Sequence, residues 1–358
     1  MSKIKELKEW YEARERRFSS LFLLSGFIFD SLTLQRIDSL GDNLWLGINL
    51  LVVALCIILI NREENIGEEK SLKHFWLFNI LQFSFGALLG ACFIFYFRSA
   101  ALSVSWPFLL LLLGAILANE FFKKHYERLI FQLSFFYLVV FVFLIFLLPV
   151  LLHQIGALIF VLSGFTSLFV AWVFINLVKR FSREKFKKSF TQIWVSVLSI
   201  FVVINLLYFT NLIPPIPLSL KDAGIYHSVS KNDQGVYFLA REEKSFWERL
   251  HFRQKVHVLS NEPMYAYSAI FAPGALNTRV VHEWQYKDDK GKWTTASRIP
   301  LYLSGGRAEG FRTFSVKLNL DAGVWRVNVE NPRGALIGRI NFEVVPVTKS
   351  PELKTIRD

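Results

Sequence analysis

The chain has 358 residues, of which 53% are hydrophobic and 36 are Phe, and its mean hydropathy is +0.36. These apolar residues are gathered in long runs, which excludes an ordinary soluble protein. The formal charge of +12 is compatible with a nucleic-acid partner, but the basic residues are distributed as they are in a membrane protein.

The first residues, 1–17, read MSKIKELKEWYEARERR and predict a charged, amphipathic segment in the cytoplasm. A small-residue cleavage site does not follow the next apolar run. We therefore interpret that run as an uncleaved signal anchor rather than a removable signal peptide.

Residues 18–213 contain apolar segments of about 20 residues, the length that a helix needs to cross a bilayer. The segments are 18–35, 43–60, 74–97, 101–119, 129–151, 154–178 and 191–213. We predict a transmembrane α-helical bundle of about seven helices. Cys56 and Cys92 both lie in predicted spans, so the remainder of the chain has no thiolate for a disulfide or a metal.

The Lys and Arg residues of 1–213 follow the positive-inside rule. Of 20 such residues, 18 precede the first segment or lie between segments two and three, four and five, or six and seven. Only Arg36 and Arg98 fall in the other connections. The pattern predicts a cytoplasmic N-terminus and, after an odd number of spans, a C-terminal domain outside the cytoplasm.

The stretch GFIFDSLTLQRID, residues 26–38, carries charges within an apolar segment. Asp30 lies about 12 residues into the first span, roughly 18 Å deep, and carboxylates at such depth are functional candidates. Asp30, Arg36, Asp38 and Arg98 form a candidate charged cluster near the outer leaflet. In the alternative interpretation the helix ends early, and Arg36 pairs with Asp30 or Asp38 near the headgroups.

Other polar residues in the spans favour packing over transport. Most predicted helices contain one or two amide side chains, which typically form interhelical hydrogen bonds. They are Asn79, Gln82, Gln132, Asn176 and Asn205. The stretch KRFSREKFKKSF, residues 179–190, is expected to be a basic cytoplasmic loop that sets the topology, or alternatively one that contacts anionic headgroups.

The composition after the last span is that of a β domain. Prolines in NLIPPIP forbid a continuing helix, so residues 214–250 are predicted to be a linker and the start of the outer domain. Residues 251–348 are predicted to be an immunoglobulin-like antiparallel β-sandwich, and 349–358 a C-terminal tail. The expected strands are 254–259, 265–272, 278–287, 292–304, 311–319, 323–330 and 336–346.

Alternation along these strands assigns a core face. Val280, His282, Trp284 and Tyr286 share one face, so His282 is expected to be a satisfied core or rim histidine, although it is kept among the candidate binding residues. Further core positions are Trp325, Val327, Val329, Ile340, Phe342 and Val344. His251 and His257 lack a third ligand, and the sequence predicts neither a metal nor a cofactor.

The most site-like element is SGGRAEGFRTFSVK, residues 304–317. Gly305 and Gly306 allow backbone amides to converge, and Arg307 and Arg312 add positive charge, an arrangement that can hold a carboxylate or phosphate. The alternative is a hairpin shaped by glycine with solvated arginines.

Several segments together resemble a known family. VVHEW, SGGRAEGFRTFSVK, GVWRVNV and GALIGRINFEV resemble the C-terminal β module called domain of unknown function 2914. GFIFDSLTLQRID, YFRSAALSVSWPF and NLIPPIPLSLKDAGIYH are similar to the membrane half of such proteins. The resemblance implies an integral protein of the bacterial inner membrane with a periplasmic β domain. It brings no established activity and no catalytic residue.

These observations favour a non-catalytic protein whose outer domain binds a protein or an anionic envelope polymer. Residues 214–358 contain 21 basic and 15 acidic residues, a difference of +6, which favours anionic partners. Membrane lipids are expected partners and nucleic acid is not. The alternative is a membrane-embedded enzyme or transporter that uses Asp30, Arg36, Asp38 and Arg98 on a lipid-linked or small anionic substrate.

Overall fold

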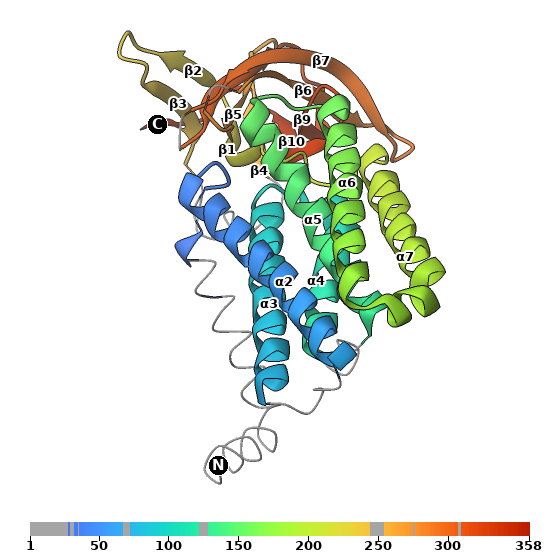
Figure 1. Cartoon of the computed structure of the whole chain (residues 1–358). Helices are drawn as coiled ribbons and strands as arrows, with labels where there is room; N and C mark the ends of the chain where they lie inside the picture. Colours follow the sequence, from blue (N-terminus) through green and yellow to red (C-terminus); the bar gives the residue numbers. More distant parts are fainter. Residues whose placement is uncertain are drawn as a thin grey trace. The chain divides into compact units, whose positions relative to one another are not determined.

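A computed structural model describes residues 28, 32–34, 36–66, 72–121, 128–243, 254–274, 276–306 and 309–358 (Figure 1). The chain divides into a helical unit, formed mainly by residues up to Thr210, and a β unit, formed mainly by Asn211–Asp358.

The helical unit contains membrane-type helices, as the sequence predicts. Within the described residues there are six rather than seven, and all are long and apolar enough to cross a membrane. The remaining predicted segment, 18–35, falls largely outside those residues. The helices are α2 (Leu40–Ile66), α3 (Leu72–Arg98), α4 (Leu102–Phe121), α5 (Leu129–Leu152), α6 (Ala157–Phe181) and α7 (Arg183–Phe209).

The basic stretch 179–190 is not a loop, contrary to the sequence-based expectation. It forms the end of α6 and the first turns of α7, with only Ser182 between the two helices. Lys and Glu are good helix formers, and Lys187 Nζ lies 3.8 Å from Glu184 Oε1 on adjacent turns. The last span therefore begins eight residues earlier than the apolar run alone indicates.

Amide side chains join some of the helices. Asn61 Nδ2 of α2 donates to Gln132 Oε1 of α5 at 2.7 Å, and Gln82 and Asn119 exchange side chain to backbone hydrogen bonds of 3.2 Å between α3 and α4. Interhelical bonding is thus confirmed for Gln82 and Gln132. The other amides donate to the carbonyl four residues earlier in their own helix: Asn79, Asn176 and Asn205.

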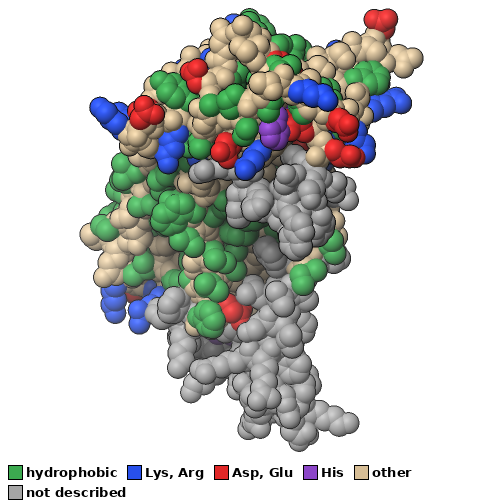
Figure 2. Space-filling view, turned by 180° about the vertical axis from the view of Figure 1, so that it is seen from behind, with side chains coloured by type: hydrophobic (Ala, Val, Ile, Leu, Met, Phe, Trp, Pro, Cys, Tyr) green, Lys and Arg blue, Asp and Glu red, His purple; other side chains and the backbone are tan. Residues whose placement is uncertain are grey.

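The surface of the helical unit suits lipid. In Figure 2 hydrophobic side chains dominate this surface, and Lys and Arg gather at its lower end. Large apolar side chains point outward, among them Leu51 and Phe83 at 71% exposure each. An apolar exterior of this extent is unfavourable in water and favourable in a bilayer.

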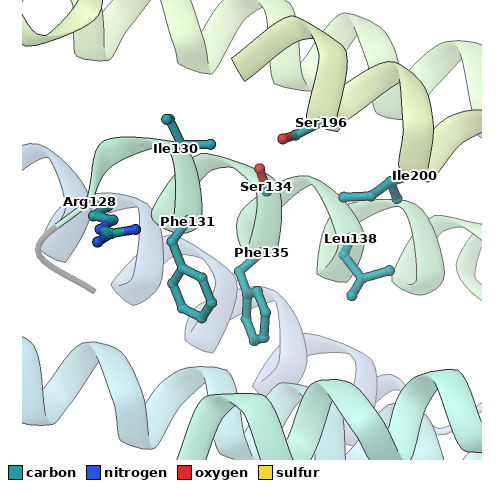
Figure 3. Close-up of a pocket in the computed structure, with 8 residues that line it drawn as sticks. All are labelled: Arg128, Ile130, Phe131, Ser134, Phe135, Leu138, Ser196 and Ile200. Carbon is teal, nitrogen blue, oxygen red and sulfur yellow. The ribbon is translucent and has the colours of Figure 1, made fainter. Parts of the chain in front are cut away.

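Helix α7 packs through a narrow stripe. Its buried residues are Phe186, Ile193, Val197 and Ile204. Beside this stripe, between α5 and α7, lies a groove with a volume of about 410 Å³ (Figure 3).

The β unit consists of three sheets. The strands are β1 (Ser219–Tyr226), β2 (Ser228–Lys231), β3 (Tyr237–Glu242), β4 (Gln254–Val258), β5 (Met264–Phe271), β6 (Asn277–Lys287), β7 (Trp293–Ser304), β8 (Phe311–Lys317), β9 (Gly323–Glu330), β10 (Leu336–Pro346) and β11 (Leu353–Arg357). The sheet orders are β1-β5-β8, β4-β10-β9-β6-β7 and β11-β3-β2.

Seven of these strands, β4 to β10, coincide with the predicted ones. Strands β1, β2 and β3 lie in the range expected to hold a linker and the start of the outer domain, and β11 lies in the range expected to be a tail. One pairing differs in direction from the prediction, because β4 runs parallel to β10.

The five-stranded sheet and the β1-β5-β8 sheet stack as two layers around a shared core. Trp284 and Phe342 of the five-stranded sheet meet edge to face, with ring centroids 6.1 Å apart. Ile225 and Met264 of the β1-β5-β8 sheet belong to the same buried cluster. The predicted core face is confirmed, although its residues divide between two clusters, one around Trp284 and one that includes Val280 and Val329.

Candidate functional site

The face of the five-stranded sheet opposite the core carries a buried charged network. His282 and Trp284 of β6 point into the core, so the alternation of a strand places Glu283 and Gln285 on the other face. In the antiparallel pairing of β6 with β9, Glu283 lies opposite Asn328. Two glutamates, Glu283 and Glu330, are more than nine-tenths buried on this face.

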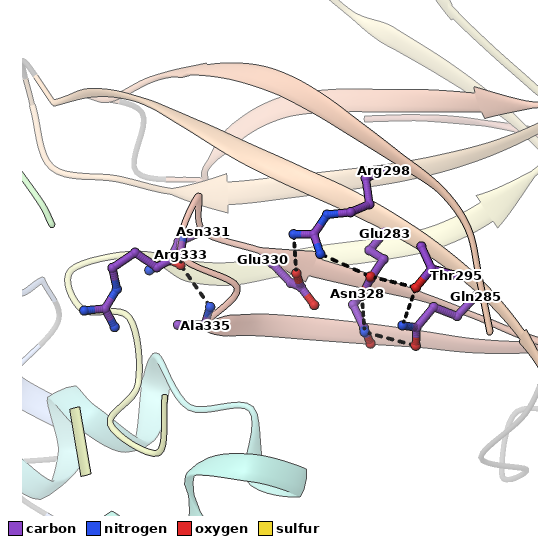
Figure 4. A network of polar contacts seen from close by, with 9 residues as sticks. All are labelled: Glu283, Gln285, Thr295, Arg298, Asn328, Glu330, Asn331, Arg333 and Ala335. Carbon is purple, nitrogen blue, oxygen red and sulfur yellow. Dashed lines mark hydrogen bonds and ion pairs between the residues drawn. The ribbon is translucent and has the colours of Figure 1, made fainter. Parts of the chain in front are cut away.

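One arginine of β7 bridges both carboxylates. Arg298 Nη1 lies 3.3 Å from Glu283 Oε1, and Arg298 Nη2 lies 3.3 Å from Glu330 Oε2 (Figure 4). Glu283 also accepts hydrogen bonds from Thr295 Oγ1 at 3.0 Å and Asn328 Nδ2 at 3.1 Å. Three strands therefore contribute to one interaction network.

The two carboxyl groups differ in acidity. Burial, and next the negative charge of Glu283, raise the pKa of Glu330 to about 7. Burial also acts to raise the pKa of Glu283, but hydrogen bonds from Asn328 and Thr295 outweigh it and hold that pKa below its usual value. The pair therefore carries about one negative charge below neutral pH and two above it.

Two further arginines extend the network across the sheet. Arg326 Nε donates to Gln285 Oε1 at 2.7 Å, and its guanidinium carbon lies 4.1 Å from the ring centroid of Trp293. Arg339 Nε donates to Asn328 Oδ1 at 2.7 Å. Burial lowers the pKa of both guanidinium groups. With three guanidinium groups and two carboxylates, this network has an excess of positive charge suited to an anionic partner.

A second cluster lies near strand β3. His227 Nε2 is 3.0 Å from Glu242 Oε1, and His227 Nδ1 is 3.0 Å from Glu262 Oε1. His257 Nδ1 lies 2.6 Å from Glu242 Oε2. Burial acts against a charged His227, but the hydrogen bonds to both glutamates prevail and raise its pKa. In the described part of the chain, no group of three or more His, Cys, Asp or Glu side chains could hold a metal ion.

In the predicted glycine turn, the backbone amides of Gly305 and Gly306 bond to carbonyls of this chain. The amide of Gly305 donates to the Leu276 carbonyl at 2.8 Å, and that of Gly306 donates to the Ala272 carbonyl at 3.1 Å. Gly306 has a φ of 102°, which favours glycine. Both amides therefore hold the turn together. Arg307 lies outside the described residues.

Arg312 is bound by the end of the same chain. Its Nε lies 2.9 Å from Asp358 Oδ2, and its Nη2 lies 3.4 Å from Glu309 Oε2. The hydroxyl of Tyr267 also donates to the Asp358 carboxylate. The guanidinium group lowers the pKa of Asp358. Arg312 thus recognises a carboxylate, as its chemistry predicts, but that carboxylate belongs to this chain.

His282 lies in the core and is satisfied there. Its Nε2 is 2.8 Å from Ser268 Oγ, and its Nδ1 is 2.9 Å from Ser315 Oγ. Trp284 Nε1 donates to the same Ser315 oxygen at 3.0 Å. Burial lowers the pKa of His282 to about 4, so the imidazole is neutral at physiological pH. These contacts give it a structural place between two sheets.

Three members of the membrane charged cluster are described. Arg36 and Asp38 form a two-bond ion pair, with Nε to Oδ1 at 3.0 Å and Nη2 to Oδ2 at 2.8 Å. Arg98, the last residue of α3, donates to the carbonyl of Leu34. The segment 34–38 thus gathers these charges at one end of the helical unit. Asp30 lies outside the described residues.

Sequence reasoning missed both polar clusters of the β unit. For Glu283 and Glu330 a signal was present in the sequence. Each lies next to a core residue, Trp284 or Val329, so strand alternation places both carboxylates on the outer face of the sheet. For His227, Glu242 and Glu262 there was no such signal, since they are 15 and 20 residues apart on elements whose pairing is not apparent from spacing.

The fold and the polar face define a membrane-type helical region followed by a β domain with a charged sheet face. Residues 277–344 match the family described as protein of unknown function (DUF2914), which confirms the resemblance for the C-terminal part. The matched range runs from β6 to β10 and contains the whole Glu283–Glu330 network.

No curated protein matches the chain. A β-glucosidase from Listeria innocua in complex with gluconolactone is similar over 30% of this chain and 16% of its own, at 10% identity and a TM-score of 0.19. The alkylpurine DNA glycosylase AlkC of Pseudomonas fluorescens, bound to DNA containing an abasic site analogue, is similar over 86% of this chain and 99% of its own, at 11% identity and a TM-score of 0.22. Likeness this weak transfers no property to this chain.

The raised pKa of Glu330 predicts a pH-dependent cost in stability. Ionisation of the buried carboxyl disfavours the folded state as the pH rises from about 4.5 to 7, by about 3 kcal/mol in full. Glu330→Gln mimics the protonated form, so we expect it to stabilise the protein at pH 8 and to change little at pH 5. Thermal unfolding of the full chain in detergent, followed by tryptophan fluorescence, measures this. An equal gain from the exposed control Glu352→Gln would contradict it.

His227 predicts a second pH dependence. Because its folded pKa is raised, the stabilisation is present below about pH 6.5 and is lost as the pH rises through the folded pKa. We expect residues 254–262 to be better protected from hydrogen exchange at pH 6 than at pH 8, after correction for the chemical rate. His227→Gln should abolish that difference, and His153→Asn, at an exposed histidine, should preserve it. A difference that survives in His227→Gln would refute the assignment.

Proposed function

We propose that this chain is a multi-pass protein of the bacterial inner membrane, with a cytoplasmic N-terminus and a periplasmic β domain of immunoglobulin-like type. The β domain binds a protein or an anionic component of the envelope without catalysing a reaction. The observation that carries this proposal is the unequal distribution of basic residues between the two ends of the helices.

Successive helices run in alternate directions if each crosses the bilayer. The connections after α2, α4 and α6 then lie at one end, together with basic residues such as Arg62, Lys73, Arg128 and Lys187. The connections after α3 and α5 lie at the other end, where Arg98 and, just before α2, Arg36 are the basic residues. The positive-inside rule assigns the basic end to the cytoplasm. Helix α7 starts at that end, so the β unit follows on the opposite side.

The charged sheet face supports a binding role. Arg298, which bridges Glu283 and Glu330, keeps 51% of its side chain exposed, so it can contact a partner while it remains in the network. Arg326 stacked on Trp293 supplies a neighbouring cationic and aromatic surface. Arg307, expected from the sequence to hold an anion, remains part of the proposal, whereas Arg312 is engaged by Asp358.

A second candidate is the membrane-embedded enzyme or transporter. The gathering of Arg98 and the Arg36–Asp38 pair on segment 34–38 favours it, because three charges of the predicted cluster lie at one end of the helical unit. Such a role further requires Asp30 to face the same space. Charged residues in this position also fit a helix end at the headgroups, and the non-catalytic proposal accounts for the β unit as well.

Single cysteines test the orientation. In a chain with Cys56 and Cys92 replaced by alanine, we expect Lys349→Cys in the β unit to react with a membrane-impermeant maleimide in intact spheroplasts. Lys187→Cys in α7 should react only after the membrane is permeabilised. Both positions are exposed, so access depends on the side of the membrane. The reverse labelling pattern would refute the orientation.

Cosedimentation with purified peptidoglycan sacculi, an anionic polymer, tests the binding role. We expect the full chain in detergent to cosediment less as salt increases, and Arg298→Gln to weaken binding several-fold, because one exposed guanidinium is lost. Arg298→Lys should retain most of the binding, and Arg357→Gln removes one exposed charge elsewhere as a control. Equal binding by Arg298→Gln and Arg357→Gln would remove the sheet face from the proposal.

A further inference from the structure

The groove between α5 and α7 changes in polarity along its length. It is lined by Arg128, Ile130, Phe131, Ser134, Phe135, Leu138, Ser196 and Ile200. Arg128 lies at one end, directly before the first residue of α5, and most of the remaining lining is apolar. Figure 3 shows the hydroxyls of Ser134 and Ser196 directed into the space between the two helices.

The groove exists because α7 contacts its neighbours most closely in its C-terminal half, after Ile200. The ring of Phe201 stacks on Phe141 at 5.8 Å, and that of Tyr208 stacks on Phe160 at 3.5 Å. Gly164 permits this approach, since a Cβ atom there would lie 3.1 Å from Phe201. At Ser196 the side chain is too small to fill the space beside α5.

The groove contains a positive charge and a hydroxyl group without a hydrogen-bond partner among the described residues, two features that favour a polar lipid. Arg128 is exposed at the basic end of the helices, where its own carbonyl accepts the first hydrogen bonds of α5. The N-terminus of that helix also favours an anion. Ser134 Oγ is buried and has no hydrogen-bond partner in the described part of the chain. An unpaired buried hydroxyl is costly unless a ligand accepts its hydrogen bond.

The groove is too small to enclose a whole helix. From Arg128 to Leu138 the groove follows ten residues of α5, roughly 15 Å. A helix of that length and about 10 Å in diameter occupies about 1,200 Å³, whereas the groove has about 410 Å³. An acyl chain is thin enough to enter.

We propose that this groove binds one anionic glycerophospholipid. Its phosphate group contacts Arg128, an ester carbonyl accepts the hydrogen bond of Ser134, and an acyl chain follows Phe131, Phe135 and Leu138 toward Ile200. The site would fix a lipid between α5 and α7 at the basic end of the helices. It is independent of what the β unit binds.

Native mass spectrometry of the full chain in detergent tests the site. The probes are phosphatidylglycerol, which is anionic, and phosphatidylcholine of the same acyl chains, which is zwitterionic. We expect retention of one phosphatidylglycerol in preference to phosphatidylcholine. Arg128→Gln should reduce its affinity about fivefold, because one basic residue near a headgroup is lost. Ser196→Trp should abolish retention by filling the groove.

Matched variants keep the test decisive. Ser199→Trp places the same bulk on an exposed position of α7, and Arg183→Gln removes a charge from the same end outside the groove. Both should retain phosphatidylglycerol as the parent chain does. Equal retention of the two lipids, or equal losses in Ser196→Trp and Ser199→Trp, would overturn the proposal. A variant that fails to give the parent circular-dichroism spectrum is replaced by Ser134→Leu, which fills the same groove.

Discussion

The need to satisfy polar groups away from water governs both halves of this protein. In an apolar medium a chain segment must pair its backbone groups internally, and a helix does so within itself. Side chains at depth meet the same demand: Asn61 bonds to Gln132 between helices, and Asn176 bonds to its own helix. Where the prolines of 214–217 end the helical half, the backbone pairs between strands instead.

In the β unit, polar side chains on the two faces of one strand are satisfied in different ways. His282 of β6 is buried with a serine on each ring nitrogen and stays neutral. Its neighbour Glu283 points the other way and remains ionised because Asn328, Thr295 and Arg298 surround it. A shift of one residue in register would exchange these environments. The inner hydrogen bonds and the outer ion pairs therefore specify one register together.

Local properties of the sequence predicted most of the fold. Apolar length and strand alternation are read from neighbouring residues. The helices α2 to α6 and the strands β4 to β10 were therefore found within three residues, apart from the end of α2. Strand β1 was missed because its pairing is irregular between Leu220 and Asp222, which disturbs the alternation. Strand β11 was missed because most of its side chains are exposed.

The candidate site divides in the same way. The common face of Glu283 and Glu330 follows from alternation and could have been predicted, but the bridge by Arg298 depends on β7 lying beside β6. His227 meets Glu242 and Glu262 only because β2, β3 and the turn after β4 come together. A chain sequence specifies such contacts through the whole fold, so short motifs do not reveal them.

The two titrating clusters act on stability in the same direction. The pKa of Glu330 is raised, so ionisation of its carboxyl group destabilises the folded state. His227 stops contributing to the stability of the folded state when it loses its proton. Both effects make the β unit less stable as the pH rises through neutrality. The lower limit is set by Glu242, Glu283 and Asp358, whose pKa values are lowered by their partners and which lose those interactions in acid. The β unit is therefore most stable in mild acid, between these limits. If the β unit lies on the outer side of a bacterial membrane, as we propose, it meets the pH of the surroundings directly, and this pH dependence acts at the proposed binding face.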